Sequence, residues 1–388
     1  MKKSIVTALV VALSTVALVG CEVRGTAQRT ALDIDAGQYK TVKSDAGIGT
    51  PAWMAGAELG AYVPYPAEID ERLDHARLGT SPLGTLDQLA EFVDGVEDVP
   101  ENKKFQFGFL TESLDEAVKL SRSLMLGVLR YPDEGTARAA AAATAEANLA
   151  ARIAQDKKFD NDGRRRLSEP AGFPAGAKLI QGRDSIGTIS MMLLVPHGRD
   201  VLLMDYYNSY TSETEALDTL KRAVGLMTDR IEGAGGVDVA SSMRNVDVVE
   251  LTVPFRSGVD PLMKFEGTAA LRKAYAHSYN YSPRVLKILT AAGVDVVGQR
   301  ETAVFRAASK VKAEGLQKAF VDFEGDSWKR VGTPRDLPIA DCAKTDDLFQ
   351  PFQCTVVVGR YYATGSAKKL LDAQQKISAQ YLILKERG

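Results

Sequence analysis

The stretch "SLMLGVLRYPDEGTARAAAAATAEANLAARIA" (residues 123–154) carries the clearest structural signal in this 388-residue chain. Residues 123–131 form a nearly continuous apolar run, which predicts a β-strand. Pro132 and Asp133 end the run. The segment after them is rich in alanine, the residue with the best helix propensity, and Asp133 is a suitable N-cap. The stretch therefore predicts a strand followed directly by a long helix.

The residues that follow continue this order of elements. Residues 177–207 predict strands separated by turn signals at residues 182–184 and 197–200. Ser212 and Glu215 form a capping box that opens a second helix. The apolar residues of that helix recur at steps of three and four, which predicts one buried stripe. The stripe consists of Leu217, Leu220, Val224, Met227 and Ile231.

The second half of the chain repeats the order with different residues. It predicts a helix at 282–293 capped by Ser282, a strand at 301–307, a helix at 309–320, strands at 327–331 and 354–363, a helix at 366–380 and a closing strand at 381–384. Strand, helix, strand, strand, helix in each half indicates an α+β protein. We expect two tandem ferredoxin-like (split β-α-β) modules, with antiparallel sheets and helices on one face. The predicted domains are residues 46–255 and 256–388.

The N-terminus has the layout of a secretory signal peptide over residues 1–20. Lys2 and Lys3 precede an uncharged, largely apolar run that ends in Leu18-Val19-Gly20-Cys21. This ending matches a bacterial lipobox, so we expect Cys21 to be lipidated and residues 21–45 to form a tether. The predicted location is the extracytoplasmic face of the cell membrane. An ordinary cleaved signal peptide and an uncleaved membrane helix are the alternatives.

The other two cysteines, Cys342 and Cys354, flank an 11-residue segment that contains a proline and can fold back on itself. An extracytoplasmic location permits disulfides, so a Cys342–Cys354 bridge is expected. Zinc is the rival interpretation. It needs more ligands than two cysteines, and the three histidines lie at no metal-like spacing from them.

Composition excludes some classes of function. The apolar content of 45% and charged content of 25% are those of a globular protein, and the net charge of −2 argues against a nucleic-acid partner. The sequence offers no phosphate-binding glycine loop and no metal-ligand set, so no cofactor is expected. The expected partners are the membrane, through the lipid anchor, and an envelope lipid, glycan or protein ligand.

A tyrosine-rich segment, "YAHSYNYS", is the candidate ligand patch. Tyr275, His277, Tyr279 and Tyr281 could stack on a sugar or line an apolar groove. Because tyrosine is also common at partly solvent-exposed positions that bind no ligand, packing is the alternative role. The segment "DYYNSY" (205–210) invites the same two interpretations.

Motifs for catalysis and metal binding are weak. Ser309–Lys312 and Ser366–Lys369 fit the Ser-x-x-Lys pattern, but its companion motifs are missing and both serines stand where a helix should start. His197 lies in a predicted hairpin turn. The segment "DNDG" (160–163) resembles a calcium loop, but Lys158 stands where an acid is required. Capping and turn formation explain these residues.

Several stretches resemble a family of uncharacterised lipoproteins from mycolic-acid-bearing actinobacteria. They are "LDIDAGQYKT" (32–41), "FGFLTES" (107–113), "GVLRYPDEGTARAAAAA" (127–143), "AGVDVVGQRETAVFRA" (292–307) and the ending from Cys354 to Leu384. The resemblance implies an N-terminal domain, a smaller C-terminal domain and membrane anchoring. It offers no catalytic residues. The sequence thus favours a binding or structural envelope lipoprotein, with an envelope hydrolase as the alternative.

Overall fold

The computed structural model describes residues 34–77, 80–117, 122–158, 164–183, 187–256 and 266–386. Residues 34–388 form one compact unit. The predicted signal peptide, Cys21, residues 21–33 of the predicted tether, and the "DNDG" segment lie outside the described residues. Within the described ranges, every helix is too short or too polar to span a bilayer.

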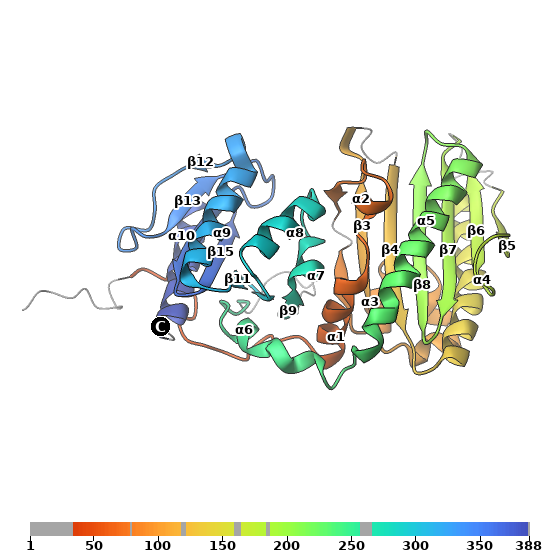
Figure 1. The fold of residues 1–388 in the computed structure, drawn as a ribbon, viewed down its shortest axis with the longest axis horizontal. Coiled ribbons are helices and arrows are strands. Elements are labelled where there is room, and N and C mark those ends of the chain that lie inside the picture. The colour runs from red at the N-terminus through yellow and green to blue at the C-terminus, as the bar shows by residue number, and fades with distance from the viewer. Residues whose placement is uncertain are drawn as a thin grey trace, which may run out of the picture. The chain divides into compact units, whose positions relative to one another are not determined.

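The first half of the chain forms an eight-stranded antiparallel sheet in the order β1-β3-β4-β8-β7-β6-β5, with β2 also paired to β3. We call residues 51–245 the N-terminal module (Figure 1). Its strands are β1 (His75–Ala76), β2 (Ser81–Leu83), β3 (Phe107–Leu114), β4 (Arg122–Arg130), β5 (Arg166–Ser168), β6 (Lys178–Arg183), β7 (Ile189–His197) and β8 (Asp200–Asn208). Its α-helices are α1 (Pro51–Leu59), α2 (Pro66–Ile69), α3 (Leu86–Ala90), α4 (Glu134–Lys158) and α5 (Glu213–Ile231). Short 3₁₀ helices are η2 (Gly60–Tyr62), η3 (Val96–Asp98), η4 (Pro100–Lys104), η6 (Glu232–Gly236) and η7 (Ser242–Asn245).

Helices cover both faces of this sheet, so the expectation of helices on one face was wrong. Alternate residues of β4 point to opposite sides: Leu126 joins the core under α5, and Met125 joins the core under α4. Figure 1 shows α5 crossing the near face of the sheet. The physical reason is visible in the sequence, because a strand buried on both faces needs a continuous apolar run rather than an alternating one.

The second half forms a seven-stranded antiparallel sheet in the order β12-β13-β14-β15-β11-β10-β9. With α6, which packs on β10, it makes up the C-terminal module, residues 246–256 and 266–386. Its strands are β9 (Thr268–Leu271), β10 (Val296–Gln299), β11 (Ala303–Arg306), β12 (Lys329–Arg330), β13 (Asp341–Lys344), β14 (Phe352–Val358) and β15 (Tyr361–Ala367). Its helices are α6 (Val246–Glu250), α7 (Arg272–Ala276), α8 (Ser282–Ala291), α9 (Lys310–Glu324), η8 (Gly325–Ser327) and α10 (Leu370–Lys385).

The two modules share one topology, but it is not the split β-α-β arrangement. In the N-terminal module, α4 leads from β4 into the meander β5-β6-β7-β8, whose last strand pairs with β4. In the C-terminal module, α9 leads from β11 into the meander β12-β13-β14-β15, whose last strand pairs with β11. The strand after the helix, β5 or β12, is parallel to the strand before it, but three strands lie between the two, whereas a split β-α-β unit has one strand between its parallel strands. The repeat of element order is real, and the connection within it differs from the expected one.

Local signals gave correct boundaries in several places and failed in others. Asp133 caps α4, with its carboxylate 2.8 Å from the backbone nitrogen of Thr136, and Ser212 with Glu215 forms the capping box of α5. The predicted strand 354–363 is a hairpin that turns at Gly359, where φ is +55°. The predicted closing strand 381–384 is the last turn of α10, because its apolar residues continue that helix's buried face.

Helix α1 lies between the two sheets and contacts β3 and β9. The Trp53 indole donates a hydrogen bond of 2.6 Å to Thr268 Oγ1, and Met54 Sδ accepts one from the backbone nitrogen of Ala269. A Cβ atom at Gly56 would collide with the carbonyl oxygen of Gly108, so glycine is needed where α1 meets β3. One short helix thus holds both modules.

Residues 34–48 form a strap along the C-terminal module. Ala36 and Tyr39 belong to the core under α10, and Tyr39 is only 5% exposed. The Tyr39 hydroxyl donates to Asp372 at 2.8 Å, and Ile48 forms a parallel bridge with Gly267. Residues 34–45 were expected to belong to the tether, and this part of it is packed rather than free.

The disulfide between Cys342 and Cys354 is confirmed. The two residues are directly opposite partners on β13 and β14, and both are fully buried. The bridge closes a hairpin whose connecting residues, 345–351, include the exposed side chains of Leu348 and Phe349.

Candidate functional site

The tyrosine-rich segment is divided between the core and the surface. It runs from the end of α7 to the start of α8, where Tyr275 is buried, Tyr279 is half-buried and Tyr281 is 42% exposed. His277 is 1% exposed and faces the N-terminal module. The predicted patch is therefore not one surface, and its histidine is part of the packing between modules.

His277 contacts three side chains of the N-terminal module. Its ring centroid lies 4.3 Å from that of Tyr65 and 5.3 Å from that of Phe109, and its Nδ1 atom lies 3.1 Å from Thr111 Oγ1. Burial lowers the pKa of His277 to about 3, although nearby backbone groups and the charge of Glu68 act in the opposite direction. The imidazole is therefore neutral at ordinary pH and serves as a packing group.

The three tyrosines line a large cavity of about 1110 Å³. Its walls come from α1, the segment around β2, the α7–α8 turn, the end of α9 and the β13–β14 hairpin. Ligand sites commonly enclose a few hundred to about 1000 Å³, so this cavity is large enough for an extended ligand. We call it the intermodule cavity, because both modules contribute to its lining.

Aromatic rings and uncharged polar groups dominate this lining. The aromatic members are Trp53, Phe109, Phe255, Tyr275, Tyr279, Tyr281, Phe323 and Phe349. Hydroxyl and amide side chains are Thr80, Ser81, Thr268, Ser278, Asn280, Gln299, Ser327, Thr345, Gln350, Gln353 and Ser366. The cavity can therefore offer both stacking surfaces and hydrogen bonds to a bound molecule.

The end of α9 supplies a carboxyl group to the cavity. Burial raises the pKa of Glu324, the charges of Asp346 and Asp347 raise it further, and a hydrogen bond from Ser327 opposes the shift. The carboxyl oxygens of Glu324 can accept hydrogen bonds from a bound molecule. Nearby, the guanidinium group of Arg284 lies over the Phe323 ring, with Cζ 4.9 Å from the ring centroid.

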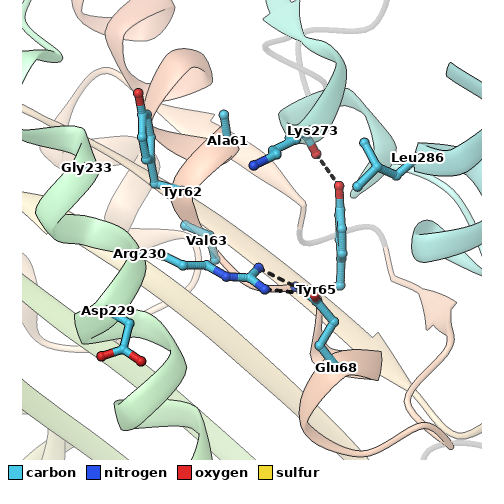
Figure 2. Close-up of a pocket in the computed structure, with 10 residues that line it drawn as sticks. All are labelled: Ala61, Tyr62, Val63, Tyr65, Glu68, Asp229, Arg230, Gly233, Lys273 and Leu286. Atoms are coloured by element: carbon cyan, nitrogen blue, oxygen red, sulfur yellow. Dashed lines mark hydrogen bonds and ion pairs between the residues drawn. The ribbon is translucent and has the colours of Figure 1, made fainter. Parts of the chain in front are cut away.

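A second, smaller pocket of about 360 Å³ lies between α5, the η2–α2 segment and the α7–α8 region (Figure 2). Arg230 pairs with both oxygens of Glu68 at 2.8 Å, and the Tyr65 hydroxyl donates to the carbonyl oxygen of Lys273. These contacts satisfy most of the polar groups that Figure 2 displays. The pocket contributes to packing between modules and is the weaker candidate for a ligand site.

No catalytic constellation is present among the described residues. His277 has Thr111 as its side-chain partner, and His75 lies between Asp74 and Glu116, so neither histidine contacts a serine. Ser309 caps α9, as expected, whereas Ser366 lies within β15 instead of at a helix start.

The remaining candidates also have structural roles. His197 ends β7 at the β7–β8 turn, and "DYYNSY" runs along β8 and past its end, with Asp205 paired to Arg152. Within the described part of the chain, no group of three histidine, cysteine, aspartate or glutamate residues could hold a metal ion.

Comparison with protein-family models assigns most of the chain. Residues 45–241 match the N-terminal domain of unknown function DUF7373, and residues 270–387 match its C-terminal domain. The chain belongs to the DUF7373 family. The expectation of an N-terminal domain followed by a smaller C-terminal one is thus confirmed, and DUF7373 carries no assigned activity.

Two further comparisons add little to the DUF7373 assignment. No curated protein matches the chain. Among solved structures, the chain is similar to the extracellular domain of PknH from Mycobacterium tuberculosis, at 10% sequence identity and a TM-score of 0.28. That likeness covers 45% of this chain and 94% of the PknH domain, and it supports no functional argument.

Several cavity residues of this DUF7373 protein were not singled out from the sequence. They include Trp53, Arg284, Phe323, Glu324 and Gln353, which stand on four different segments. Phe323 and Glu324 lie just beyond the predicted helix 309–320, about one turn after Phe320. This position was the only hint in the sequence that they could share a surface with it. No pattern in the sequence indicated that these segments meet.

Proposed function

We propose that this protein is a lipid-anchored binding protein of the cell envelope, held at the extracytoplasmic face of the membrane through Cys21. The lipobox and the signal-like N-terminus support the anchor. The Cys342–Cys354 disulfide supports the location, because disulfides persist in oxidising compartments. The resemblance to lipoproteins of mycolic-acid-bearing actinobacteria supports both.

The observation that carries the binding function is the intermodule cavity. It encloses about 1110 Å³ and draws its walls from both modules of one compact unit. Its lining combines aromatic rings with hydroxyl and amide side chains, which suits the binding of a molecule. The hydrolase alternative has no specific observation in its favour.

The anchor is tested with a Cys21→Ala variant expressed in a bacterium that processes lipoproteins. The variant should move from the membrane to the soluble fraction, and intact-mass analysis of the wild type should show acyl groups on Cys21. Unchanged fractionation, together with a mass that shows no retained signal helix, would refute lipidation.

The binding function is tested by native mass spectrometry of the protein extracted from its own membrane. The wild type should carry a small molecule, and Ser278→Trp, which places a bulky ring at an exposed position of the cavity wall, should carry less. Asp229→Asn, in the smaller pocket, is the control and should behave as the wild type. Equal occupancy in both variants, or an empty wild type, contradicts the proposal.

A further inference from the structure

The charges that line the intermodule cavity argue against a polyanionic ligand. Five carboxylates face three arginines there: Glu116, Glu266, Glu324, Asp346 and Asp347 against Arg77, Arg284 and Arg300. Arg77 is paired with Glu112 at 2.8 Å, and Arg300 donates to the backbone carbonyl oxygens of Ala46 and Thr252 at 2.6 Å. A phosphate-rich ligand would meet an excess of negative charge and two arginines that are already engaged.

The distribution of polar groups argues against a simple acyl chain. Hydroxyl and amide side chains occur on the walls from both modules, Thr80 and Ser81 on one side and Ser278, Gln299 and Ser366 on the other. Thr80 and Ser81 have partners in Thr111 Oγ1 and the carbonyl oxygen of Pro82. A hydrocarbon chain would displace water from Ser278, Gln299 and Ser366 without replacing its hydrogen bonds, and each such loss is costly. The lining suits a ligand that is uncharged and carries many hydroxyl groups.

One corner of the cavity combines aromatic rings with planar polar side chains. Tyr281 and Phe323 lie 6.4 Å apart between ring centroids, and Arg284 lies over Phe323. Arg284 is exposed, and the contact of its guanidinium group is with the Phe323 ring. The Gln353 Nε2 atom donates to Thr364 Oγ1 at 2.7 Å, and the side-chain carbonyl oxygen of Gln353 has no hydrogen-bond partner among the described residues. These groups are free to bond a ligand.

Tyr281 is held in an uncommon backbone conformation at this corner. Its φ is +56°, in the left-handed region. Among the described residues, Tyr281 is the only one other than glycine with a positive φ. Its backbone nitrogen donates to the carbonyl oxygen of Asp74 at 2.6 Å, and its ring lies 5.1 Å from that of His75. Contacts with the N-terminal module thus fix a half-exposed ring at the cavity wall, which is typical of functional positions.

We propose that the intermodule cavity binds a neutral oligosaccharide, with one sugar ring against Tyr281 and Phe323 and its hydroxyl groups bonded by Arg284, Glu324 and Gln353. This inference rests on the proposed binding function and names its ligand class. A sugar ring has an apolar C–H face, which an aromatic ring contacts well, and an edge of hydroxyl groups. Guanidinium, carboxyl and amide groups are planar, and each can bond two neighbouring hydroxyls.

The test measures binding of three linear probes, maltohexaose, cellohexaose and α-1,5-arabinohexaose, to the full chain in a detergent without a sugar headgroup. Calorimetry should detect binding of at least one probe at millimolar concentration or below. Saturation-transfer NMR should then show the strongest transfer to ring C–H protons of that probe. Phe323→Ala and Arg284→Gln should each weaken its affinity tenfold or more. Because Arg284 is exposed, Arg284→Gln should still fold. Weaker binding by this variant would therefore reflect a lost contact with the probe and not unfolding.

Matched controls and a lipid probe separate the outcomes. Asp229→Asn should leave oligosaccharide affinity unchanged, and Tyr281→Phe, which keeps the ring, should bind more tightly than Tyr281→Ala. One outcome is that cis-parinaric acid binds the wild type but not Phe323→Ala, and that no hexaose binds. This outcome overturns the oligosaccharide as ligand class, while the binding function stands. If neither kind of probe binds, both proposals are overturned.

Discussion

The two modules repeat one strand order but are stabilised by different chemistry. The central strands of the N-terminal module, β4, β7 and β8, each have nine residues, and its helices α4 and α5 have 25 and 19. In the C-terminal module, β14 and β15 have seven residues, β10 and β11 have four, and α9 and α10 have 15 and 16. Each module has a buried ion pair, Arg130–Asp200 in the larger and Lys376–Glu301 in the smaller, and the smaller one adds a disulfide.

The difference follows from the size of each core. A small core buries less apolar surface per residue, so a covalent cross-link contributes a larger share of its stability. In the larger core, Arg130 pairs with Asp200 at 2.7 and 2.9 Å and also donates to the carbonyl oxygens of Ala234 and Val237. Arg130 thereby holds the segment that follows α5 against the end of β4.

Substituting Arg130 should have the largest effect. Arg130→Ala leaves the buried Asp200 without its partner, so the free energy of unfolding should fall by about 3–5 kcal/mol. Urea unfolding followed by circular dichroism measures the change. Arg138→Ala, which breaks an exposed pair with Glu134, should cost less than about 1 kcal/mol. Equal losses in the two variants would show that Arg130 does not hold the N-terminal module.

Removing the disulfide should have the next largest effect and should be local to the C-terminal module. In Cys342→Ala with Cys354→Ala, the closed loop is short, and the free energy of unfolding should fall by about 3 kcal/mol. Hydrogen exchange with mass spectrometry should show lost protection in β13 and β14 and unchanged protection in β7. Equal loss in β7 and β14 would mean that the two modules unfold together.

Acidification should weaken the contact between the modules. Because burial lowers the pKa of His277 to about 3, against about 6.5 in an unfolded chain, the unfolded state binds an extra proton between these values. The stability from neutral His277 is present above about pH 6.5 and is lost as pH falls, by up to about 1.4 kcal/mol per pH unit.

Urea midpoints at about pH 7 and about pH 5 measure this effect. His277→Gln should flatten the pH dependence, since glutamine does not titrate. The control His197→Gln, at the β7–β8 turn, should leave it unchanged. An unchanged slope in His277→Gln would show that this contact does not respond to pH.

The elements confirmed from sequence had signals within one short segment. The continuous run at 123–131, the Asp133 cap and the capping box of Ser212 and Glu215 each involve neighbours in the chain, so propensity and local hydrogen bonding decide them. The hairpin at Gly359 also had a local signal, a glycine between two apolar runs. The expected single strand overlooked it.

The remaining features depend on contacts between distant segments. Whether residues 381–384 continue a helix is decided by the core under α10, which includes Tyr39. The cavity requires Trp53, Tyr281 and Gln353 to meet, and they are separated by more than 70 residues in sequence at each step. The composition of one short segment indicated the tyrosines as a candidate patch, but it could predict neither the cavity nor the burial of His277.

The strap has a mechanical consequence. Tension applied to the chain before residue 34 first reaches Asp35 and Tyr39, which are bonded to Gln375 and Asp372 on α10. Those side-chain bonds lie one after another along the strap, so they would break in sequence, as in peeling, before the load reaches α1. The wall of the intermodule cavity that α1 provides is therefore shielded from pulling at the N-terminus until the strap has detached.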